Sequence, residues 1–268
     1  MTGTTALVDR IAQQLEALAV LADGAGMRSI AREIRDDRLP ALREGRMSIV
    51  VLGEFNHGKS TAINALLGTD VLPTGITPTT SVITHIRRSY PGAPAARVVR
   101  DGGVTDLAAD QLRDLVTHDQ PDDLRYVEVL TDAPFLTDGL VVVDTPGVND
   151  ISQQKVEITY GYVPRADVVL YVLDATQALK RSELQFIESR LIRNSHDRLF
   201  FLLGKTDALS AQEVDEIVTH VKGKLAHIVG DVPIFPVSAR RAMRGEDPAF
   251  DVFREALGNY IADQRQQI

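Results

Sequence analysis

The 268-residue sequence contains no cysteine. Disulfide bonds and thiolate metal sites are therefore excluded, and a reducing compartment such as the cytosol fits this composition. No stretch of about 18 consecutive apolar residues occurs, so the sequence predicts no membrane-spanning helix. The N-terminal apolar pattern carries Asp9 and Glu16 within it, which argues against a signal peptide.

The sequence also has fewer basic than acidic residues. The chain has 29 Lys and Arg residues against 37 Asp and Glu residues, for a net charge of -8 and a pI near 5.3. Nonspecific nucleic-acid binding needs clustered Lys and Arg, so we expect no nucleic-acid partner. The hydrophobic share of 44% is ordinary for a globular protein of this length.

Short apolar runs rich in β-branched residues recur along the chain and predict buried parallel strands. They lie at Ser48–Leu52, Leu140–Val143, Val168–Leu173, Leu199–Leu203 and Val232–Val237. Helical patterns separate most of them, for example over Glu183–Ile192 and Ala211–Ile228. This alternation predicts an α/β fold with a mostly parallel central sheet and ligand sites at the carboxyl ends of the strands.

Residues 92–137 interrupt the alternation. A turn at Asp101–Gly103 predicts a hairpin whose first strand includes Arg97–Arg100. A short helix around Leu112–Val116 follows, and Tyr126–Leu130 is typical of a strand that runs antiparallel to its neighbour.

Both ends of the chain show amphipathic helical patterns. Near the N-terminus the apolar stripe consists of residues at spacings of three and four, namely Leu7, Ile11, Leu15, Leu18 and Leu21. The pattern breaks at Asp23–Gly24, resumes, and is expected to end at Pro40. Asp247–Pro248 is typical of a helix start, with Asp as the N-cap.

We therefore expect three segments, an N-terminal helical segment over 1–45, a nucleotide-binding domain over 46–245 and a C-terminal helix over 246–268. The N-terminal helices fit either a hairpin packed on its own domain or one piece of a longer bundle. The abrupt end at Gln267–Ile268 leads us to expect a longer parent protein.

A phosphate-binding motif lies directly after the first strand. Gly53–Ser60 (GEFNHGKS) matches G-x-x-x-x-G-K-[ST] and precedes an apolar helix at Ala62–Leu67. In such a loop the backbone N–H groups surround the β-phosphate, while Lys59 reaches the β- and γ-phosphates and Ser60 ligates Mg²⁺. The helix N-terminus adds partial positive charge. The residues expected at the nucleotide are Glu54, Phe55, Asn56, His57, Gly58, Lys59, Ser60 and Thr61.

Two further motifs follow predicted strands. In Asp144-Thr-Pro-Gly147 we expect Asp144 to hold Mg²⁺ through water and Gly147 to offer its N–H to the γ-phosphate. Gly204-Lys-Thr-Asp207 resembles the guanine motif [NT]-K-x-D. Asp207 would accept hydrogen bonds from guanine N1–H and N2–H₂, which adenine does not offer in this arrangement, and Lys205 would lay its stem on the base.

Taken in order, these motifs resemble the translation-factor-related GTPases. Ser238-Ala239-Arg240 is similar to their fifth motif, in which a backbone N–H meets guanine O6. GEFNHGKSTAINALLG followed by VLPTGITPTT closely resembles dynamin-like proteins and mitofusins, above all the GTPase head of bacterial dynamin-like proteins. The resemblance covers roughly residues 46–245 and implies a three-layer P-loop GTPase fold that binds GTP or GDP with Mg²⁺.

The resemblance also implies further site residues and partners. In that family the Thr that lies seven residues after the proline of a Leu-Pro pair enters the Mg²⁺ shell. In this sequence that residue is Thr80, and Thr77 and Thr79 are the alternatives. We expect catalysis to involve Lys59, Ser60, Thr80, Asn56 and Gly147. The family pattern implies a head-to-head dimer across the nucleotide sites. It implies membrane contact only through parts outside these 268 residues, and a cytoplasmic protein peripheral at the inner face of the membrane.

Three positions depart from related patterns. Val148 follows the D-x-x-G motif where Ras carries a water-positioning glutamine. Phe55 occupies the phosphate-loop position where dynamins carry a catalytic glutamine, and Gly204 replaces the usual Asn or Thr. We interpret Gly204 as lowering guanine affinity without removing guanine preference.

Two loop residues have alternative interpretations. The pattern G-x-x-N-x-G-K-S resembles potassium-activated GTPases, so Asn56 either ligates K⁺ or Na⁺ beside the phosphates or only satisfies backbone groups of its loop. His57 is either a water-orienting group or, as we expect, a solvent-facing loop residue.

Three functions fit the sequence. The first is the head of a dynamin-like mechanoenzyme whose GTP hydrolysis is stimulated by self-assembly and coupled to membrane remodelling or fusion. The second is a ribosome- or tRNA-associated GTPase, against which the acidic composition counts. The third is a GTP-gated scaffold with little turnover, which Phe55 and Gly204 keep open.

Overall fold

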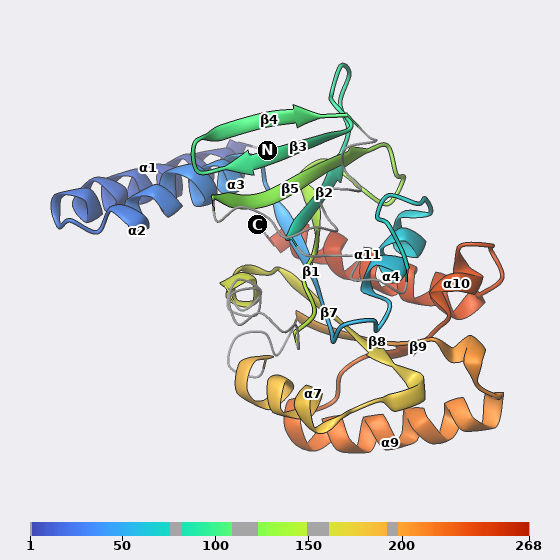
Figure 1. Cartoon of the computed structure of the whole chain (residues 1–268). Coiled ribbons are helices and arrows are strands. Elements are labelled where there is room, and N and C mark those ends of the chain that lie inside the picture. Colours follow the sequence, from blue (N-terminus) through green and yellow to red (C-terminus); the bar gives the residue numbers. More distant parts are fainter. Residues whose placement is uncertain (1, 76–81, 109–122, 149–160, 192–197, 268) are drawn as a thin grey trace. The chain divides into compact units, whose positions relative to one another are not determined.

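The computed structural model describes residues 2–75, 82–108, 123–148, 161–191 and 198–267 (Figure 1). The chain divides into two compact units, one of Ser48–Asn259 and one of Met1–Met47 with Tyr260–Ile268. The three-segment division expected from the sequence stays a prediction.

Within the described ranges the larger unit is built on a nine-stranded sheet. Its strands lie side by side in the order β4-β3-β5-β2-β6-β1-β7-β8-β9. Their bounds are β1 Met47–Leu52, β2 Thr84–Arg88, β3 Ala96–Arg100, β4 Gly103–Leu107, β5 Leu124–Thr131, β6 Leu140–Asp144, β7 Val168–Asp174, β8 Leu199–Gly204 and β9 Ile234–Pro236.

The predicted α/β class is confirmed. Strands β1, β7, β8 and β9 pair in parallel, in the region where strands and helices alternate along the chain. The predicted hairpin is formed by the antiparallel strands β3 and β4. Strand β5 is antiparallel to β3, as expected, and parallel to β2, while β2 is antiparallel to β6. The helix expected around Leu112–Val116 lies outside the described residues.

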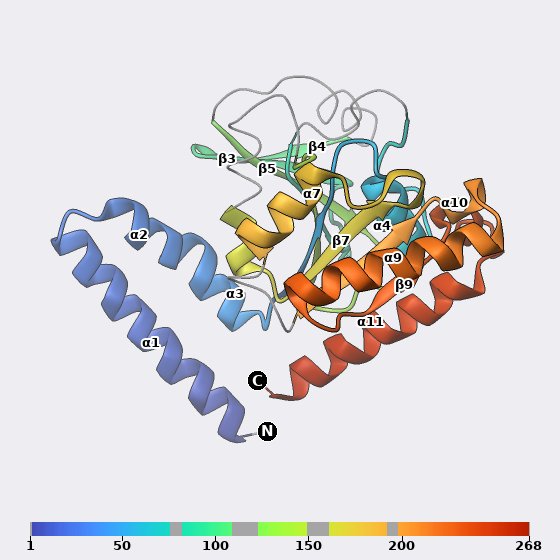
Figure 2. The same cartoon turned by 90° about the horizontal axis from the view of Figure 1, so that it is seen from below.

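Helices cover both faces of the parallel strands. In Figures 1 and 2, α7 (Arg181–Phe186) and α9 (Ala211–Val229) lie on one side, and α4 (Lys59–Leu67) and α11 (Pro248–Gln267) lie on the other. The period of two along the strands explains this. Phe201 of β8 packs through Tyr171 onto the α7 side, whereas its neighbour Phe200 stacks with Phe235, which contacts Phe253 of α11.

The C-terminal helix begins as the sequence predicts. Asp247 lies directly before Pro248, and its Oδ1 accepts a hydrogen bond from the Ala249 N–H at 3.1 Å. Its Oδ2 accepts another from the Ser238 N–H at 2.5 Å. One carboxylate therefore caps α11 and fixes the loop that carries the fifth motif.

The N-terminal unit contains α1 (Thr2–Gly24), α2 (Arg28–Glu33), a π-helical turn (Ile34–Arg38) and α3 (Leu39–Arg43). The prediction that Pro40 ends the helix was wrong. Pro40 lies in the first turn of α3, where a missing N–H is tolerated, and the helix runs on to Arg43.

The buried face of α1 is lined mainly by alanines, and of the predicted leucine stripe only Leu15 packs partly buried against them. Ala12, Ala19 and Ala22 are buried with Ala31 of α2, because small side chains allow two helices to approach closely. Leu18 and Leu21 are 51% and 70% exposed. Among the described helices of the chain, none is both long enough and apolar enough to cross a membrane.

Candidate functional site

The phosphate loop connects β1 to α4 by a tight path. Gly53 has φ +147°, and a Cβ atom there would lie 2.4 Å from the Val172 carbonyl oxygen of β7. Gly58 adopts the left-handed conformation at the N-cap of α4, and no side chain caps this helix in the described part of the chain. The first N–H groups of α4 therefore face the loop without a capping side chain, as anion binding requires.

The predicted phosphate-binding lysine lies across this loop. Lys59 Nζ donates hydrogen bonds to the carbonyl oxygens of Gly53 at 3.1 Å and Glu54 at 2.9 Å. Its side chain is buried, so its charge acts in a region of low solvent screening.

The structure brings two of the predicted Mg²⁺ ligands together. Ser60 Oγ donates to Asp144 Oδ2 at 3.1 Å, although the residues are 84 positions apart. Both are buried, and a hydroxyl with a carboxylate is the all-oxygen donor set that Mg²⁺ prefers. These residues fit the ion, which would neutralise the buried carboxylate when bound. Thr80 and its alternatives Thr77 and Thr79 lie outside the described residues.

Position 147 accepts only glycine because it lies directly against the backbone of the phosphate loop. A Cβ atom at Gly147 would lie 2.7 Å from the Phe55 backbone nitrogen and 2.9 Å from Phe55 Cα. The next residue, Val148, donates its N–H to the Gly53 carbonyl at 3.2 Å. The D-x-x-G turn thus packs directly on the loop, in the place where the sequence predicts the γ-phosphate.

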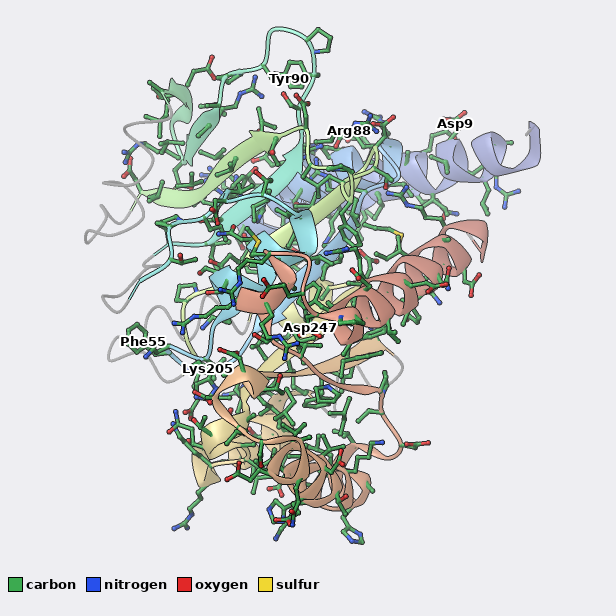
Figure 3. All side chains as sticks on the ribbon, turned by 90° about the vertical axis from the view of Figure 1, so that its right-hand side faces the viewer. Asp9, Phe55, Arg88, Tyr90, Lys205 and Asp247 are labelled. Atoms are coloured by element: carbon green, nitrogen blue, oxygen red, sulfur yellow. The ribbon has the colours of Figure 1, made fainter. Side chains whose placement is uncertain are left out.

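Asn56 has a structural reason to be asparagine. Its φ is +61°, and asparagine tolerates this left-handed conformation better than most residues. Its backbone carbonyl accepts a hydrogen bond from Lys205 Nζ at 2.7 Å. The neighbouring Phe55 is 44% exposed and projects outward from the loop (Figure 3).

A cavity of about 670 Å³ adjoins the phosphate loop and is lined by the predicted base-binding residues other than Ser238. Its lining includes Asn56, Gly58, Thr61, Lys205, Asp207, Ala239 and Arg240. Ser238 Oγ donates to Asp207 Oδ1 at 2.6 Å, which orients the carboxylate. A smaller hollow of about 50 Å³ lies among Phe55, Lys59, Ser60 and Gly147. Phosphate and base motifs therefore meet in one region.

Asp174 is a site residue that the sequence analysis missed. It ends β7, is 1% exposed, and its Oδ2 lies 2.6 Å from Lys205 Nζ. Burial raises the pKa of this carboxyl, but hydrogen bonds from Lys205 and Thr176 outweigh it and lower the pKa from 3.8 to about 2. An acidic residue at the carboxyl end of a buried parallel strand is the signal that could have identified it.

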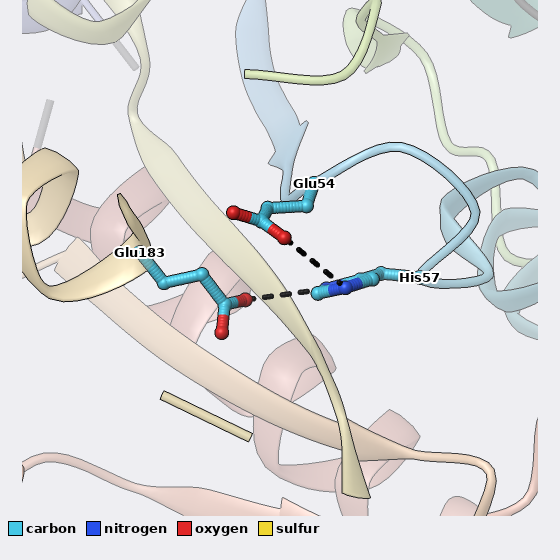
Figure 4. Close-up of side chains that lie close together, drawn as sticks. All are labelled: Glu54, His57 and Glu183. Carbon is cyan, nitrogen blue, oxygen red and sulfur yellow. Dashed lines mark ion pairs between the residues drawn. The ribbon is translucent and has the colours of Figure 1, made fainter. Parts of the chain in front are cut away.

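The expectation that His57 faces solvent was wrong. His57 is 1% exposed, and its ring lies between two carboxylates (Figure 4). Its Nε2 is 3.6 Å from Glu54 Oε2, and its Nδ1 is 3.2 Å from Glu183 Oε1. The sequence gives no sign of this because Glu183 follows far along the chain, on α7.

The Glu54 side chain also points away from the phosphate position, toward the start of α7. It lies 3.1 Å from Lys180 Nζ and 2.5 Å from Ser182 Oγ. Burial raises the pKa of this carboxyl, and the hydrogen bonds from Ser182 and Lys180 outweigh it, so the pKa is lowered overall. Only the backbone of Glu54 is therefore left for nucleotide contact.

A phosphate loop on a central α/β sheet, joined to a pocket with a guanine-type motif, defines a P-loop GTPase domain. The sequence profile of the Dynamin family matches residues 49–206. The chain therefore belongs to the dynamin family, and its predicted resemblance to a bacterial dynamin-like GTPase head is confirmed.

Individual relatives agree with this assignment. The probable transmembrane GTPase FZO-like of Arabidopsis thaliana is 37% identical over 74% of this chain and 20% of its own length. The bacterial dynamin-like protein of Nostoc punctiforme is 27% identical over 78% of this chain and 32% of its own. A solved oligomerised bacterial dynamin pair shares the fold with a TM-score of 0.60 at 18% identity, over 95% of this chain and 43% of that one. This chain thus spans less than half of these three proteins.

The Asp174–Lys205 pair predicts a pH dependence of stability. The folded-state pKa is below the ordinary value, so the stabilisation is present above about pH 4 and is lost as the pH falls toward 2. We expect wild type to be more stable than Asp174→Asn at pH 7, with a difference in unfolding free energy that narrows mainly between pH 4 and pH 2. Urea unfolding at each pH measures this gap. A gap that stays constant over that range would contradict the assignment.

Proposed function

We propose that this chain binds GTP with Mg²⁺ and hydrolyses it to GDP and phosphate. Lys59 and the N-terminus of α4 would hold the phosphates, Ser60 and Asp144 with Thr80 would hold Mg²⁺, and Gly147 would meet the γ-phosphate. In the base pocket Asp207 would select guanine, with Lys205 on the base and the Ser238–Arg240 loop at O6. The observation that carries this proposal is the Ser60–Asp144 contact, which joins the phosphate loop to the D-x-x-G motif next to a cavity of about 670 Å³ that is lined by the phosphate loop and the base motifs.

We further propose that hydrolysis is slow in single heads and is stimulated when two heads pair across their nucleotide sites. Val148 and Phe55 leave the loop without the glutamines that related GTPases use. Phe55 is 44% exposed on this loop, so a second chain could contact it directly. The name of the solved relative, a dynamin pair that senses and tethers membranes, agrees with self-association.

Coupling to membranes would require parts of the protein beyond these 268 residues, and we propose a peripheral association at the cytoplasmic face. The exposed Leu18 and Leu21 of α1 support the interpretation that the N-terminal helices join a longer bundle. Their unpaired apolar face is the kind of surface that further helices cover.

Gly204 offers a gain-of-affinity test of the base pocket. A Cβ atom at this position would lie 3.5 Å from Leu173 O and 3.9 Å from His57 O, which are ordinary contacts, so a side chain fits. We expect Gly204→Asn to bind GDP about three- to tenfold more tightly than wild type, because an amide there can tie the base loop to the phosphate loop. Gly204→Ala is the matched control and should bind as wild type. Equal affinity of both variants in a fluorescent-GDP titration would contradict this interpretation.

Turnover tests the proposed mechanism. We expect the GTPase rate per molecule to rise with protein concentration, to be higher in K⁺ than in Na⁺, and to be lost in Lys59→Ala. Asn56→Gly keeps the left-handed backbone, so it should bind GDP as wild type but lose the preference for K⁺. If Asn56→Gly retains that preference, its side chain does not ligate the cation. A slow rate that is constant with concentration in both salts would favour a GTP-gated scaffold.

A further inference from the structure

One buried asparagine of α4 holds the loop of residues 68–75 that follows this helix. Asn64 is 1% exposed, and its Nδ2 donates a hydrogen bond to the Leu72 carbonyl oxygen at 2.8 Å. Its Oδ1 accepts hydrogen bonds from the N–H groups of Leu72 at 2.9 Å and Val71 at 3.1 Å. The amide therefore pairs with both polar groups of the Leu72 backbone, as a neighbouring strand would.

The backbone of Asn64 contributes to the same connection. Its carbonyl oxygen accepts hydrogen bonds from the N–H groups of Gly68 at 2.8 Å and Thr69 at 3.2 Å. Gly68 has a φ of +73° and ends α4 in the left-handed conformation that glycine adopts readily. The side chain of Leu72 is buried in the core. Asn64 thus holds both the end of the helix and the middle of the 68–75 loop.

The 68–75 loop forms one wall of the proposed nucleotide site. Thr74 and Gly75 line the cavity of about 670 Å³, and they also line the hollow of about 50 Å³ beside Lys59 and Ser60. Lys59 and Ser60 belong to the first turn of α4, and Asn64 lies about one turn further along the same helix. One helix therefore carries the phosphate-binding side chains at its start and, next to them, the amide that holds this wall.

The contacts of Asn64 require an amide of this length. Asparagine offers an acceptor and a donor from one short side chain. An aspartate would keep the acceptor but would place negative charge against the Leu72 carbonyl and against Asp70, whose Oδ1 lies 3.4 Å from Asn64 Nδ2. An alanine would leave the buried polar groups of Leu72 without these bonds, which disfavours the present conformation of the loop.

We propose that Asn64 is a positioning residue for nucleotide binding and that it acts through the 68–75 loop. Its amide holds the loop in the conformation that completes the wall of the cavity, so that the nucleotide meets a preformed site. When the loop leaves this conformation, the binding-competent fraction of the protein falls, and the apparent affinity falls with it. This inference rests on the proposed binding of a guanine nucleotide in the cavity.

The GDP affinity of Asn64→Ala tests the proposal. We expect this variant to bind a fluorescent GDP about tenfold more weakly than wild type, a change of about 1.4 kcal/mol. Ile63→Val is the matched control, because Ile63 is its buried neighbour on α4 and the change deletes one methyl group from the core but no hydrogen bond to the loop. The control should bind GDP as wild type does.

Asn64→Asp adds a rescue by pH that general loosening of the fold would not produce. A neutral carboxylic acid offers one O–H donor and one acceptor oxygen, so protonation restores the pattern of the amide. Burial and the nearby Asp70 carboxylate both raise the pKa of a carboxyl at this position. We expect the loss of GDP affinity relative to wild type to be about tenfold at pH 8 and about threefold at pH 5.5, while the loss in Asn64→Ala stays constant.

Hydrogen exchange measures the loop in the absence of nucleotide. We expect the amides of residues 68–75 to exchange faster in Asn64→Ala than in wild type or Ile63→Val, because they lose their hydrogen-bond partner. Unchanged exchange in this loop would overturn the positioning role, and so would an equal loss of affinity of Asn64→Asp at both pH values. If wild type itself binds no GDP, the proposed function fails and the inference with it. A wild type that binds GDP beside an Asn64→Ala variant of equal affinity overturns the positioning role alone.

Discussion

The approach of the phosphate loop to its neighbouring strands is the constraint on which the site depends. At Gly53 the loop leaves β1 so close to β7 that a Cβ atom would lie 2.4 Å from the Val172 carbonyl oxygen. At Gly147 in the D-x-x-G turn, a Cβ atom would lie 2.7 Å from the Phe55 backbone nitrogen. No side chain fits at either place. The loop is therefore fixed on one side by β7 and on the other by the turn after β6, and the remaining contacts are built on this position.

Around the fixed loop, three buried carboxylates are each matched by a donor. Asp144 accepts a hydrogen bond from Ser60, Asp174 pairs with Lys205, and Glu54 pairs with Lys180. Burial makes an unmatched charge costly, so each partner stabilises the carboxylate that it faces. The partners come from separate segments of the chain, so these contacts hold the segments together around the loop.

The sequence predicted the parts of this site that are local. The phosphate loop, the D-x-x-G turn and the base loop are short motifs that follow apolar strands, and parallel strands place their carboxyl ends at one edge. The hairpin at Asp101–Gly103 and the cap at Asp247 were predicted for the same reason, since turn and cap chemistry is local.

Contacts between distant segments were not predictable in this way. His57 was expected in solvent, but it is buried beside Glu183 of α7, which no local pattern connects to the loop. The leucine stripe of α1 was predicted to be buried, but apart from Leu15 it is exposed, because the choice between alanines and leucines depends on how closely α2 approaches. Pro40 was expected to end a helix, yet a first-turn proline is tolerated there.

The preference between GDP and ADP tests the central claim most directly, because the proposed guanine-binding carboxylate, Asp207, lies in the cavity beside the phosphate loop. Competition against a fluorescent guanine nucleotide measures both affinities in one assay. We expect GDP to bind at least about 100-fold more tightly than ADP, since adenine would leave the Asp207 carboxylate without its donors. Equal affinities for the two nucleotides would contradict the assignment of this pocket to guanine.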